Sequence, residues 1–294
     1  MLRALPFLLC CCAAWTQTVI PLETARGVAE VPPQPAKIAV FDWAALDSLE
    51  QLGVPVGATT AKMEIDYLAP VFARAQTVGT VFEPDYEALA RYQPDLVITG
   101  GPGAEAYPRL AEHWPTIDNA AIRESGKARI TAFGKLFGKE SEAARLIDDI
   151  DQSCARARHA AQGKGKGLVL SVTGNKAAAS GAHSRLGSWI HDDLGIPPAD
   201  PGLNDASHGQ PVSFEYIAQT NPDWLFVLDR TASLGEKGAS AKEVLNNPLV
   251  AATRAWQRGQ VIIMPNANYI AAGGAKQLKQ ACQQLEQAFS RSQP

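Results

Sequence analysis

The residues best suited to chemistry stand in loops, most of them after apolar runs that resemble strands. The first such loop is the glycine-rich segment 100–103, and Arg230 and Tyr269 follow two later apolar runs. Arg185 and His208 stand in polar, glycine-containing loops of the same half of the chain. Because ligands of open α/β sheets bind beyond the carboxyl ends of the strands, we expect a site where these loops meet.

The glycine loop first suggests a cradle for nucleotide phosphates. Gly100-Gly101-Pro102-Gly103 lacks the Lys-Ser/Thr pair of a P-loop and the third glycine of a dinucleotide fingerprint. Pro102 also removes one backbone N–H that a phosphate would use. A tight turn is therefore the better interpretation, and a nucleotide-using enzyme is retained only as a distant alternative. The chain has no serine nucleophile elbow, no His-Glu-x-x-His and no Cys-x-x-Cys motif, so we expect no enzyme.

The histidines show no metal-binding spacing. His159 falls at the end of a predicted helix and is expected in solvent, and His191 follows Trp189-Ile190 and is expected to make a structural hydrogen bond. His208 differs, because its glycine-flanked polar loop offers nothing apolar to pack on. It is the one histidine that the sequence alone suggests as a ligand. The five positions are 113, 159, 183, 191 and 208.

An internal repeat sets the architecture that positions these loops. The pattern Glu-x-(Leu/Ile)-Ala-x-x-x-Pro-Asp occurs at 87–95 and again at 215–223, and an apolar run follows each copy. Each copy predicts a short helix that ends before Pro-Asp and leads into a buried strand. A separation of 128 residues indicates two similar lobes rather than a stacked array of short repeats.

The coarse order of elements predicts an α/β fold: two Rossmann-like lobes with mainly parallel sheets, joined by one long helix. Strands alternating with helices favour parallel sheets. A stiff helix between the lobes predicts limited hinge motion. We place the N-terminal lobe at 37–138, the connecting helix at 139–162 and the C-terminal lobe at 167–294. The expected strands are 38–41, 95–99, 116–118, 168–172, 224–228 and 261–264, and a C-terminal helix is expected after Gly273-Gly274.

Composition fits a globular protein of two such lobes. The 294 residues are 46% hydrophobic and 19% charged, and the net charge of -3 gives no reason to expect a nucleic acid partner. Residues 1–20 are expected to be a signal peptide and lead-in, because Arg3 precedes an apolar run that reaches Ala14. We therefore expect export, with a lipid anchor on one of the cysteines at 10–12 as the less favoured alternative. Residues 21–36, with four prolines, are expected to form an extended lead-in.

Two cysteines remain outside that leader. Cys154 and Cys282 both fall on the apolar stripe of a predicted helix. Buried small hydrophobic side chains are the preferred interpretation, and an oxidising compartment would also permit a disulfide between them.

Taken together, several short motifs resemble the ferric-siderophore binding proteins of ABC importers, which are class III periplasmic binding proteins. The resemblance covers about residues 30–290 and is closest to the group that takes up catecholate siderophores of the enterobactin and petrobactin kind. The motifs that carry it are 184–195, 207–209, 227–230, 246–250 and 269–274.

The resemblance implies a ferric siderophore bound between the lobes, without catalysis and without an intrinsic cofactor. Arg185, Arg230 and Lys62 would face the complex, since catecholate oxygens around hard, six-coordinate Fe(III) carry negative charge. His208 and Tyr269 would complete the iron shell when a siderophore offers only four donors. The main risk for Arg230 is a surface ion pair with Asp229. Haem or cobalamin binding by the same fold is the nearest alternative function.

The resemblance also implies a partner and contains one departure. Glu87 and Glu215, from the two repeats, match the glutamates that dock onto arginines of an inner-membrane ABC permease, with the protein acting as a monomer in the periplasm. A glutamate favoured by the helix dipole explains either one alone. The family's third arginine, from the first-lobe loop after 95–99, is missing here, and Arg109 cannot be assumed to replace it.

Overall fold

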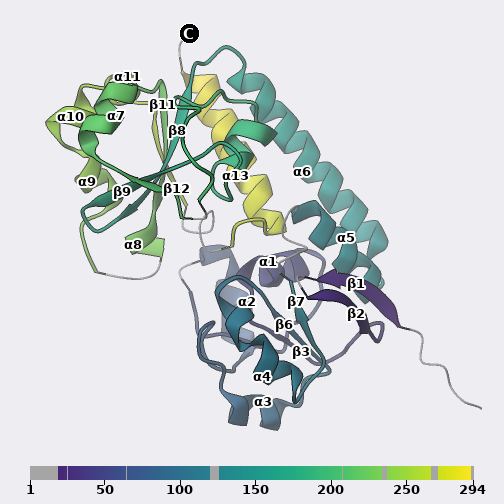
Figure 1. The fold of residues 1–294 in the computed structure, drawn as a ribbon. Coiled ribbons are helices and arrows are strands. Elements are labelled where there is room, and N and C mark those ends of the chain that lie inside the picture. Colours follow the sequence, from purple (N-terminus) through teal and green to yellow (C-terminus); the bar gives the residue numbers. More distant parts are fainter. Residues whose placement is uncertain are drawn as a thin grey trace, which may run out of the picture.

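The computed structural model (Figure 1) describes residues 19–24, 26–63, 65–119, 126–206, 208–233, 237–265 and 271–292. Its first lobe contains a five-stranded sheet in the order β5-β4-β3-β6-β7, in which every neighbouring pair is parallel. These strands are β3 (Ile38–Val40), β4 (Ala58–Thr59), β5 (Gln76–Thr77), β6 (Leu96–Thr99) and β7 (Thr116–Asp118).

Helices cover both faces of this sheet, as a parallel sheet requires. One face packs against α1, α2 and α5 around Val40 and Ile98, and the other packs against α3 and α4 around Ala39 and Val97. The elements are α1 (Trp43–Gln51), η1 (Asp66–Leu68), α2 (Ala69–Arg74), α3 (Tyr86–Tyr92), η2 (Gly101–Ala106), α4 (Tyr107–Ala111) and α5 (Gly126–Phe137).

The second lobe contains a mixed five-stranded sheet in the order β10-β9-β8-β11-β12. The three strands β8, β11 and β12 are parallel, and β9 is antiparallel to both of its neighbours. They are β8 (Gly167–Thr173), β9 (Lys176–Ser180), β10 (Gln210–Val212), β11 (Trp224–Asp229) and β12 (Val261–Met264). The remaining elements are η4 (Trp189–Asp193), α7 (Phe214–Thr220), α8 (Arg230–Ser233), α9 (Ala241–Leu245), α10 (Pro248–Ala251) and α11 (Arg254–Gln257).

The predicted repeat has the same local structure in both lobes. Asp85 caps α3 and Ser213 caps α7, each accepting a backbone N–H from the first turn of its helix. Both helices end at a residue in the left-handed conformation, Gln93 and Asn221, immediately before Pro-Asp. Asn tolerates this conformation better than most side chains, and Pro cannot continue the helix.

The aspartate of each Pro-Asp pair then holds the first strand of its own lobe. Asp95 accepts backbone N–H groups of Ala36 and Lys37, just before β3, at 3.0 and 2.8 Å. Asp223 accepts the N–H of Lys166, just before β8, at 2.9 Å. The spacing shared by the two repeats therefore reflects one structural role that occurs twice. In each lobe the aspartate aligns the helix–strand unit with the first strand of the five-stranded sheet.

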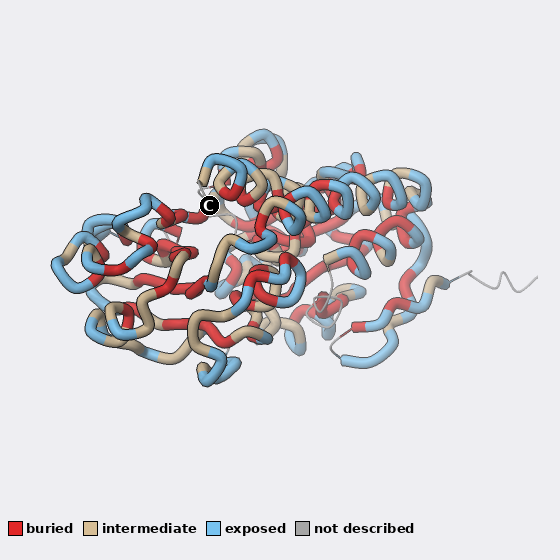
Figure 2. The backbone as a smooth tube through the Cα atoms, turned by 90° about the horizontal axis from the view of Figure 1, so that it is seen from above, coloured by how far each residue is buried: buried red, intermediate tan, exposed pale blue. Residues whose placement is uncertain are grey.

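Two long helices join the lobes. The connecting helix α6 (Glu140–Ala161) packs along α13 (Ala275–Arg291), and the two run side by side in Figure 1. Burial follows the expected pattern, with buried residues along the strands and exposed ones on the outer sides of the helices (Figure 2). No helix in the described residues has both the length and the apolar composition needed to cross a membrane.

Two expectations from the sequence were wrong. Cys154 on α6 and Cys282 on α13 form a disulfide instead of remaining free buried thiols. The reason is geometric: the packing of α6 on α13 brings their Cα atoms to 4.9 Å, within the range a disulfide spans. The lead-in is also not simply extended, because β1 (Ile20–Thr24) and β2 (Gly27–Val31) form an antiparallel hairpin. Leu22 and Val31 anchor that hairpin in the first-lobe core.

The predicted fold class is confirmed: two α/β lobes with largely parallel sheets and a long helix between them. The parallel strands of both sheets end in the loops that the sequence singled out, which fixes where a ligand site must be sought.

Candidate ligand-binding site

Arg230 follows directly on the last residue of β11, at the carboxyl edge of the second sheet. The preceding Asp229 is buried, and its two carboxylate oxygens accept the backbone N–H groups of Ala232 at 3.0 Å and Ala241 at 2.6 Å. Asp229 therefore braces the turn after β11, which is a different role from the surface ion pair with Arg230 that the sequence raised as a risk.

Arg185 lies in a compact turn after β9. The hydroxyl of Ser184 donates to the carbonyl oxygen of Gly181 at 2.8 Å and accepts the N–H of Gly187 at 3.1 Å. A side chain at Gly187 would collide with that same carbonyl oxygen, so only glycine fits there. The half-buried Arg185 is consequently presented from a rigid loop.

The loop that carries His208 is bound to the Arg185 turn. The N–H of Gly181 donates to the carbonyl oxygen of Asn204 at 3.1 Å, and the N–H of His183 donates to Asp205 Oδ1 at 2.9 Å. These two bonds fix the relative positions of the two loops before any ligand arrives.

The electrostatics place His208 beside both arginines. Partial burial first, and then the positive charges of Arg230 and Arg185, lower the pKa of His208 below its usual value. Both guanidinium groups are therefore close enough to the imidazole to act on it electrostatically. Such a group suits a polyanion, and the lowered pKa favours the neutral imidazole that a metal ion requires.

The other candidate residues for the site are Tyr269, Lys62 and Arg109. Tyr269 lies outside the described residues. Lys62 is exposed in the loop that follows β4, at the carboxyl edge of the first sheet. Arg109 lies on α4 with its guanidinium 4.4 Å from the ring centroid of Tyr86, a position in the α3–α4 layer that gives no support for Arg109 as the replacement arginine. Within the described residues, no group of three or more His, Cys, Asp or Glu side chains is arranged to hold a metal ion.

The two glutamates of the repeat occupy equivalent positions. Glu87 is exposed in the first turn of α3, and Glu215 is exposed in the first turn of α7. Glu87 pairs with Arg91 at 3.6 Å, one helical turn later. Hydrogen bonds from its own N–H and then from Ser213 lower the pKa of Glu215, so this carboxylate is ionised at neutral pH.

A cavity of about 520 Å³ lies where the two lobes meet the connecting helix. Arg185 lines it together with Arg158 of α6, Lys127 of α5 and Gly273 before α13. Arg158 donates to the carbonyl oxygen of Asp193 at 2.7 Å, and Lys127 pairs with Asp151. Of the three second-lobe residues Arg185, His208 and Arg230, Arg185 lines this cavity.

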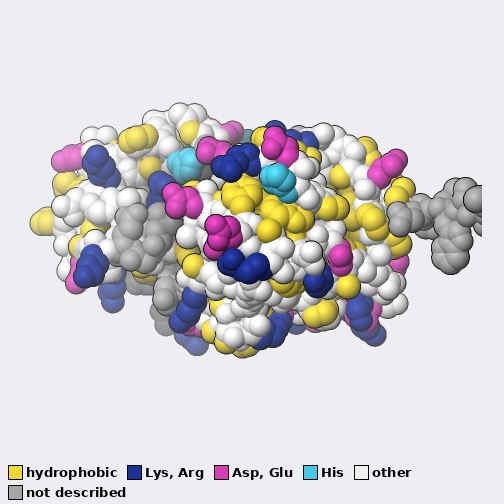
Figure 3. Space-filling model, turned by 90° about the horizontal axis from the view of Figure 1, so that it is seen from below, with side chains coloured by type: hydrophobic (Ala, Val, Ile, Leu, Met, Phe, Trp, Pro, Cys, Tyr) yellow, Lys and Arg dark blue, Asp and Glu magenta, His cyan; other side chains and the backbone are white. Residues whose placement is uncertain are grey.

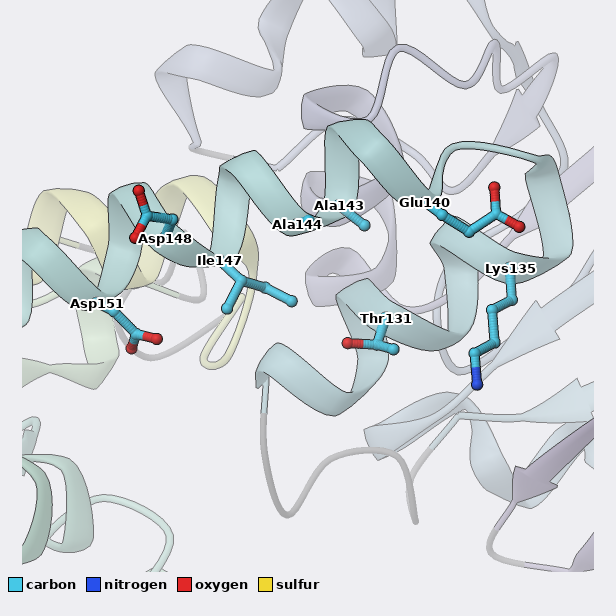
Figure 4. A pocket seen from close by; sticks show the side chains of 8 residues that line it. All are labelled: Thr131, Lys135, Glu140, Ala143, Ala144, Ile147, Asp148 and Asp151. Atoms are coloured by element: carbon cyan, nitrogen blue, oxygen red, sulfur yellow. The ribbon is translucent and has the colours of Figure 1, made fainter.

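A second hollow, a groove of about 460 Å³ between α5 and α6, is a poor candidate (Figure 4). Its rim carries Glu140, Asp148 and Asp151 against the single cation Lys135, and Ala143 and Ile147 form its apolar part. This acidic rim would repel an anion. Over the face of the molecule seen in Figure 3, Lys and Arg side chains are interspersed with Asp and Glu, without the continuous basic surface that nucleic acid needs.

One feature near Arg230 was missed from the sequence. The bracing role of Asp229 could have been found, because an Asp that ends a buried strand commonly accepts backbone N–H groups of the following turn.

Comparisons with known proteins agree with this geometry. The family model described as "Periplasmic binding protein" matches residues 38–267. The petrobactin-binding protein YclQ of Bacillus subtilis is 34% identical over 94% of this chain and 89% of its own length. The ferric-anguibactin-binding protein FatB of Vibrio anguillarum is 30% identical over 90% of this chain and 88% of its own.

Solved structures show the same similarity. The crystal structure of YclQ superposes with a TM-score of 0.88 at 32% identity, covering 94% of this chain and all of that one. The catecholate-siderophore binding protein VctP of Vibrio cholerae superposes with a TM-score of 0.84 at 28% identity, covering 92% of this chain and all of that one. The chain therefore belongs to the periplasmic binding protein family, as a substrate-binding protein and not as an enzyme.

Proposed function

We propose that this protein binds a ferric siderophore of the catecholate type between its lobes and delivers it to the permease of an ABC importer for iron uptake. The observation that supports the proposal is that the positive charges of Arg185 and Arg230 act together on His208 in the second lobe. Two fixed guanidinium groups beside a neutral imidazole are matched to an anionic iron complex and not to a neutral substrate.

The chemistry of each group supports this ligand class. A guanidinium presents a planar pair of N–H donors, which fits the adjacent oxygens of a catecholate better than an ammonium does. His208 and Tyr269 would occupy the two iron positions that a tetradentate siderophore leaves open, and Lys62 would contribute a positive charge from the first lobe. The iron is cargo carried within the siderophore complex.

The relatives support the same class of ligand and the same setting. YclQ is described as binding petrobactin, FatB as binding ferric anguibactin, and VctP as a periplasmic catecholate-siderophore binding protein. Two further relatives from Bacillus subtilis are described as "Probable siderophore-binding lipoprotein YfiY" and "Putative ABC transporter substrate-binding lipoprotein YhfQ". We infer that this chain is exported and works in the periplasm, with Glu87 and Glu215 docking onto an inner-membrane permease.

A titration of the purified protein tests the proposal. Ferric tetradentate and hexadentate catecholates, a ferric hydroxamate and haem are each added while tryptophan fluorescence and the visible charge-transfer band are recorded. We expect tight binding of the catecholates and a weakening of about 10- to 100-fold in Arg185→Gln and in Arg230→Gln, the range for losing a hydrogen bond to a charged group. We expect the charge-transfer band of the tetradentate complex to shift in His208→Ala and in Tyr269→Phe.

Two variants serve as matched controls. Arg291→Gln removes an exposed arginine at the end of α13, and His159→Ala removes an exposed histidine at the end of α6. Both should bind like the wild type. Binding of haem or the hydroxamate in preference to every catecholate would overturn the ligand class, and equal losses in the site and control variants would overturn the assigned site.

A further inference from the structure

Two described loops at the carboxyl edge of the first sheet, those after β4 and β6, carry little positive charge. The loop after β6 has no Lys or Arg between Gly100 and Pro108. The loop after β4 has one cation, Lys62. The two arginines of the site stand on the opposite lobe. An anion enclosed between two walls gains most when both walls are positive, so the carboxyl edge of the first sheet is where a further cation would matter.

Arg26 reaches that edge from outside the sheet. Its Nη2 donates to the carbonyl oxygen of Ala104 in η2, the turn that follows β6, at 3.2 Å. Its Nε pairs with Asp118 Oδ2, on the last residue of β7, also at 3.2 Å. The guanidinium carbon lies 4.8 Å from the ring centroid of Tyr107 at the start of α4. Three contacts thus hold one guanidinium across the carboxyl ends of β6 and β7.

The hairpin that carries Arg26 is built to hold it there. The turn between β1 and β2 closes with the Thr24 hydroxyl donating to the carbonyl oxygen of Gly27 at 2.7 Å and accepting the N–H of Arg26 at 3.1 Å. Gly27 takes a φ of +95°, which other residues avoid. The hairpin is itself anchored in the first-lobe core through its two strands (Figure 1).

The exposure of the pair is unequal, and this points to a second role beyond clamping. The side chain of Asp118 is 2% exposed, whereas that of Arg26 is 44% exposed. If Arg26 only held the loop after β6 against β7, the part of its guanidinium that contacts Asp118 and Ala104 would suffice. The exposed part of Arg26 presents positive charge to the space over the loop after β6, on the side of the sheet where the ligand-binding loops end.

We propose that Arg26 is a specificity-determining residue that supplies the first-lobe wall of the site with positive charge and thereby favours more highly charged ferric complexes. It lies outside residues 38–267, the part that the family model matches. The inference rests on the proposed function, since it concerns the charge of the complex bound at that same site.

The test compares Arg26→Gln, Arg26→Lys and the wild type with three ferric complexes at low ionic strength. The probes are a trianionic tris-catecholate, a monoanionic bis-catecholate and a neutral hydroxamate. We expect Arg26→Gln to weaken binding of the trianion about three- to tenfold, to weaken binding of the monoanion less and to leave any binding of the neutral complex unchanged. Arg26→Lys should recover most of the loss, and added salt should shrink it.

A second variant separates charge from clamping by the sign of its effect. Asp118→Asn breaks the same ion pair as Arg26→Gln but leaves the arginine charge without its carboxylate. If Arg26 acts through charge, Asp118→Asn binds the trianion at least as tightly as the wild type. If Arg26 is only a clamp, the two variants weaken binding of all three complexes in parallel, and the proposal is overturned.

The failure of this inference is distinguishable from that of the proposed function. A wild type that binds no ferric catecholate removes the proposed function. A wild type that binds them, with Arg26→Gln equal to it for every charge, removes only the role of Arg26.

Discussion

At the scale of single residues, the proposed site requires one imidazole to stay neutral beside two cations. Burial and the charges of Arg230 and Arg185 lower the pKa of His208. Protons compete with iron for the imidazole nitrogen, so a lowered pKa lets His208 act as a ligand at more acidic pH than an ordinary histidine would. In the proposed site, the arginines that would attract the anion would therefore also keep His208 neutral for iron.

This arrangement predicts a specific pH dependence. The affinity ratio between the wild type and His208→Ala, measured with a ferric bis-catecholate, should stay constant from neutral pH down through the usual histidine value of about 6.5 and fall toward one only below it. Taking the ratio removes the protonation of the catechol itself, which both proteins share. A ratio that already falls above pH 6.5 would mean that the pKa of His208 is not lowered, and a ratio of one at every pH would mean that His208 does not bind the iron.

At the scale of elements, the repeat is a device for aligning each helix–strand unit with the first strand of its lobe. Asp223 is the more strongly held copy, because it is less exposed than Asp95 and also pairs with Arg254 at 3.2 Å. We expect Asp223→Ala to lower the free energy of unfolding by about 1–2 kcal/mol and Asp95→Ala to lower it by less.

Chemical denaturation checks this expectation, with Asp66→Ala, an exposed aspartate on η1, as the control. Ligand affinity should be unchanged in both repeat variants, since the aspartates lie at the amino ends of the strands and the ligand loops at the carboxyl ends. A larger loss from Asp95→Ala than from Asp223→Ala would contradict the ranking.

The elements that could be predicted were those with strong local patterns. Hydrophobic periodicity and Pro-Asp breaks predict the repeat and the long amphipathic helix. They also predict the buried strands β6, β8, β11 and β12. Helix α1 begins at Trp43 because Asp42 caps it by accepting the N–H of Ala45 at 2.7 Å. The short strands β4 and β5 carry too few residues for any pattern to be visible.

What the sequence could not show depends on contacts between distant segments. The disulfide requires α6 and α13 to meet, and the hairpin requires a core for Leu22 and Val31 to enter. His191 was correctly predicted as a structural residue, and its ring Nδ1 lies 2.7 Å from the carbonyl oxygen of Ile196. The loops with Arg185, Arg230 and His208 are candidates from the sequence, but the proximity of both arginines to His208 follows from the fold alone.

At the scale of the whole molecule, each lobe carries one exposed glutamate in the first turn of its repeat helix, and we propose that both dock onto the permease. We expect the double variant Glu87→Ala/Glu215→Ala to abolish siderophore-dependent iron uptake in cells while leaving the affinity of the purified protein unchanged, because neither carboxylate lies among the ligand loops. Uptake and affinity are measured in parallel, with Glu112→Ala as an exposed-glutamate control. Normal uptake by the double variant would exclude these residues from docking.

The lobes are also joined by a buried carboxylate. Asp47 of α1, fully buried in the first lobe, accepts the N–H groups of Lys276 and Gln277 at the start of α13 at 2.8 and 3.0 Å, and the hydroxyl of Tyr67 at 2.8 Å. A negative charge at a helix N-terminus is favourable. Burial nevertheless outweighs these hydrogen bonds and raises the pKa of Asp47 to about 6.

The raised pKa predicts the sign of a pH effect on stability. Between pH 4 and 6 the native state holds a proton on Asp47 that the unfolded state has released, so the free energy of unfolding falls as pH rises through this window. Above pH 6 the cost is constant, at about 3 kcal/mol for a shift of this size. Asp47→Asn removes the titratable group and with it this pH dependence of the free energy of unfolding.

Urea unfolding of the wild type and Asp47→Asn across pH 4 to 7 isolates the effect. The stability difference, wild type minus variant, should decline by up to about 3 kcal/mol as pH rises from 4 to 6 and then level off. Asp66→Asn supplies the background for an exposed aspartate. A difference that is flat over this range would mean that Asp47 titrates alike in both states, and one that grows with pH would mean that the start of α13 stabilises the carboxylate more than burial penalises it. The decline would show that the contact between α1 and α13 holds the lobes together despite the cost of burying a charge.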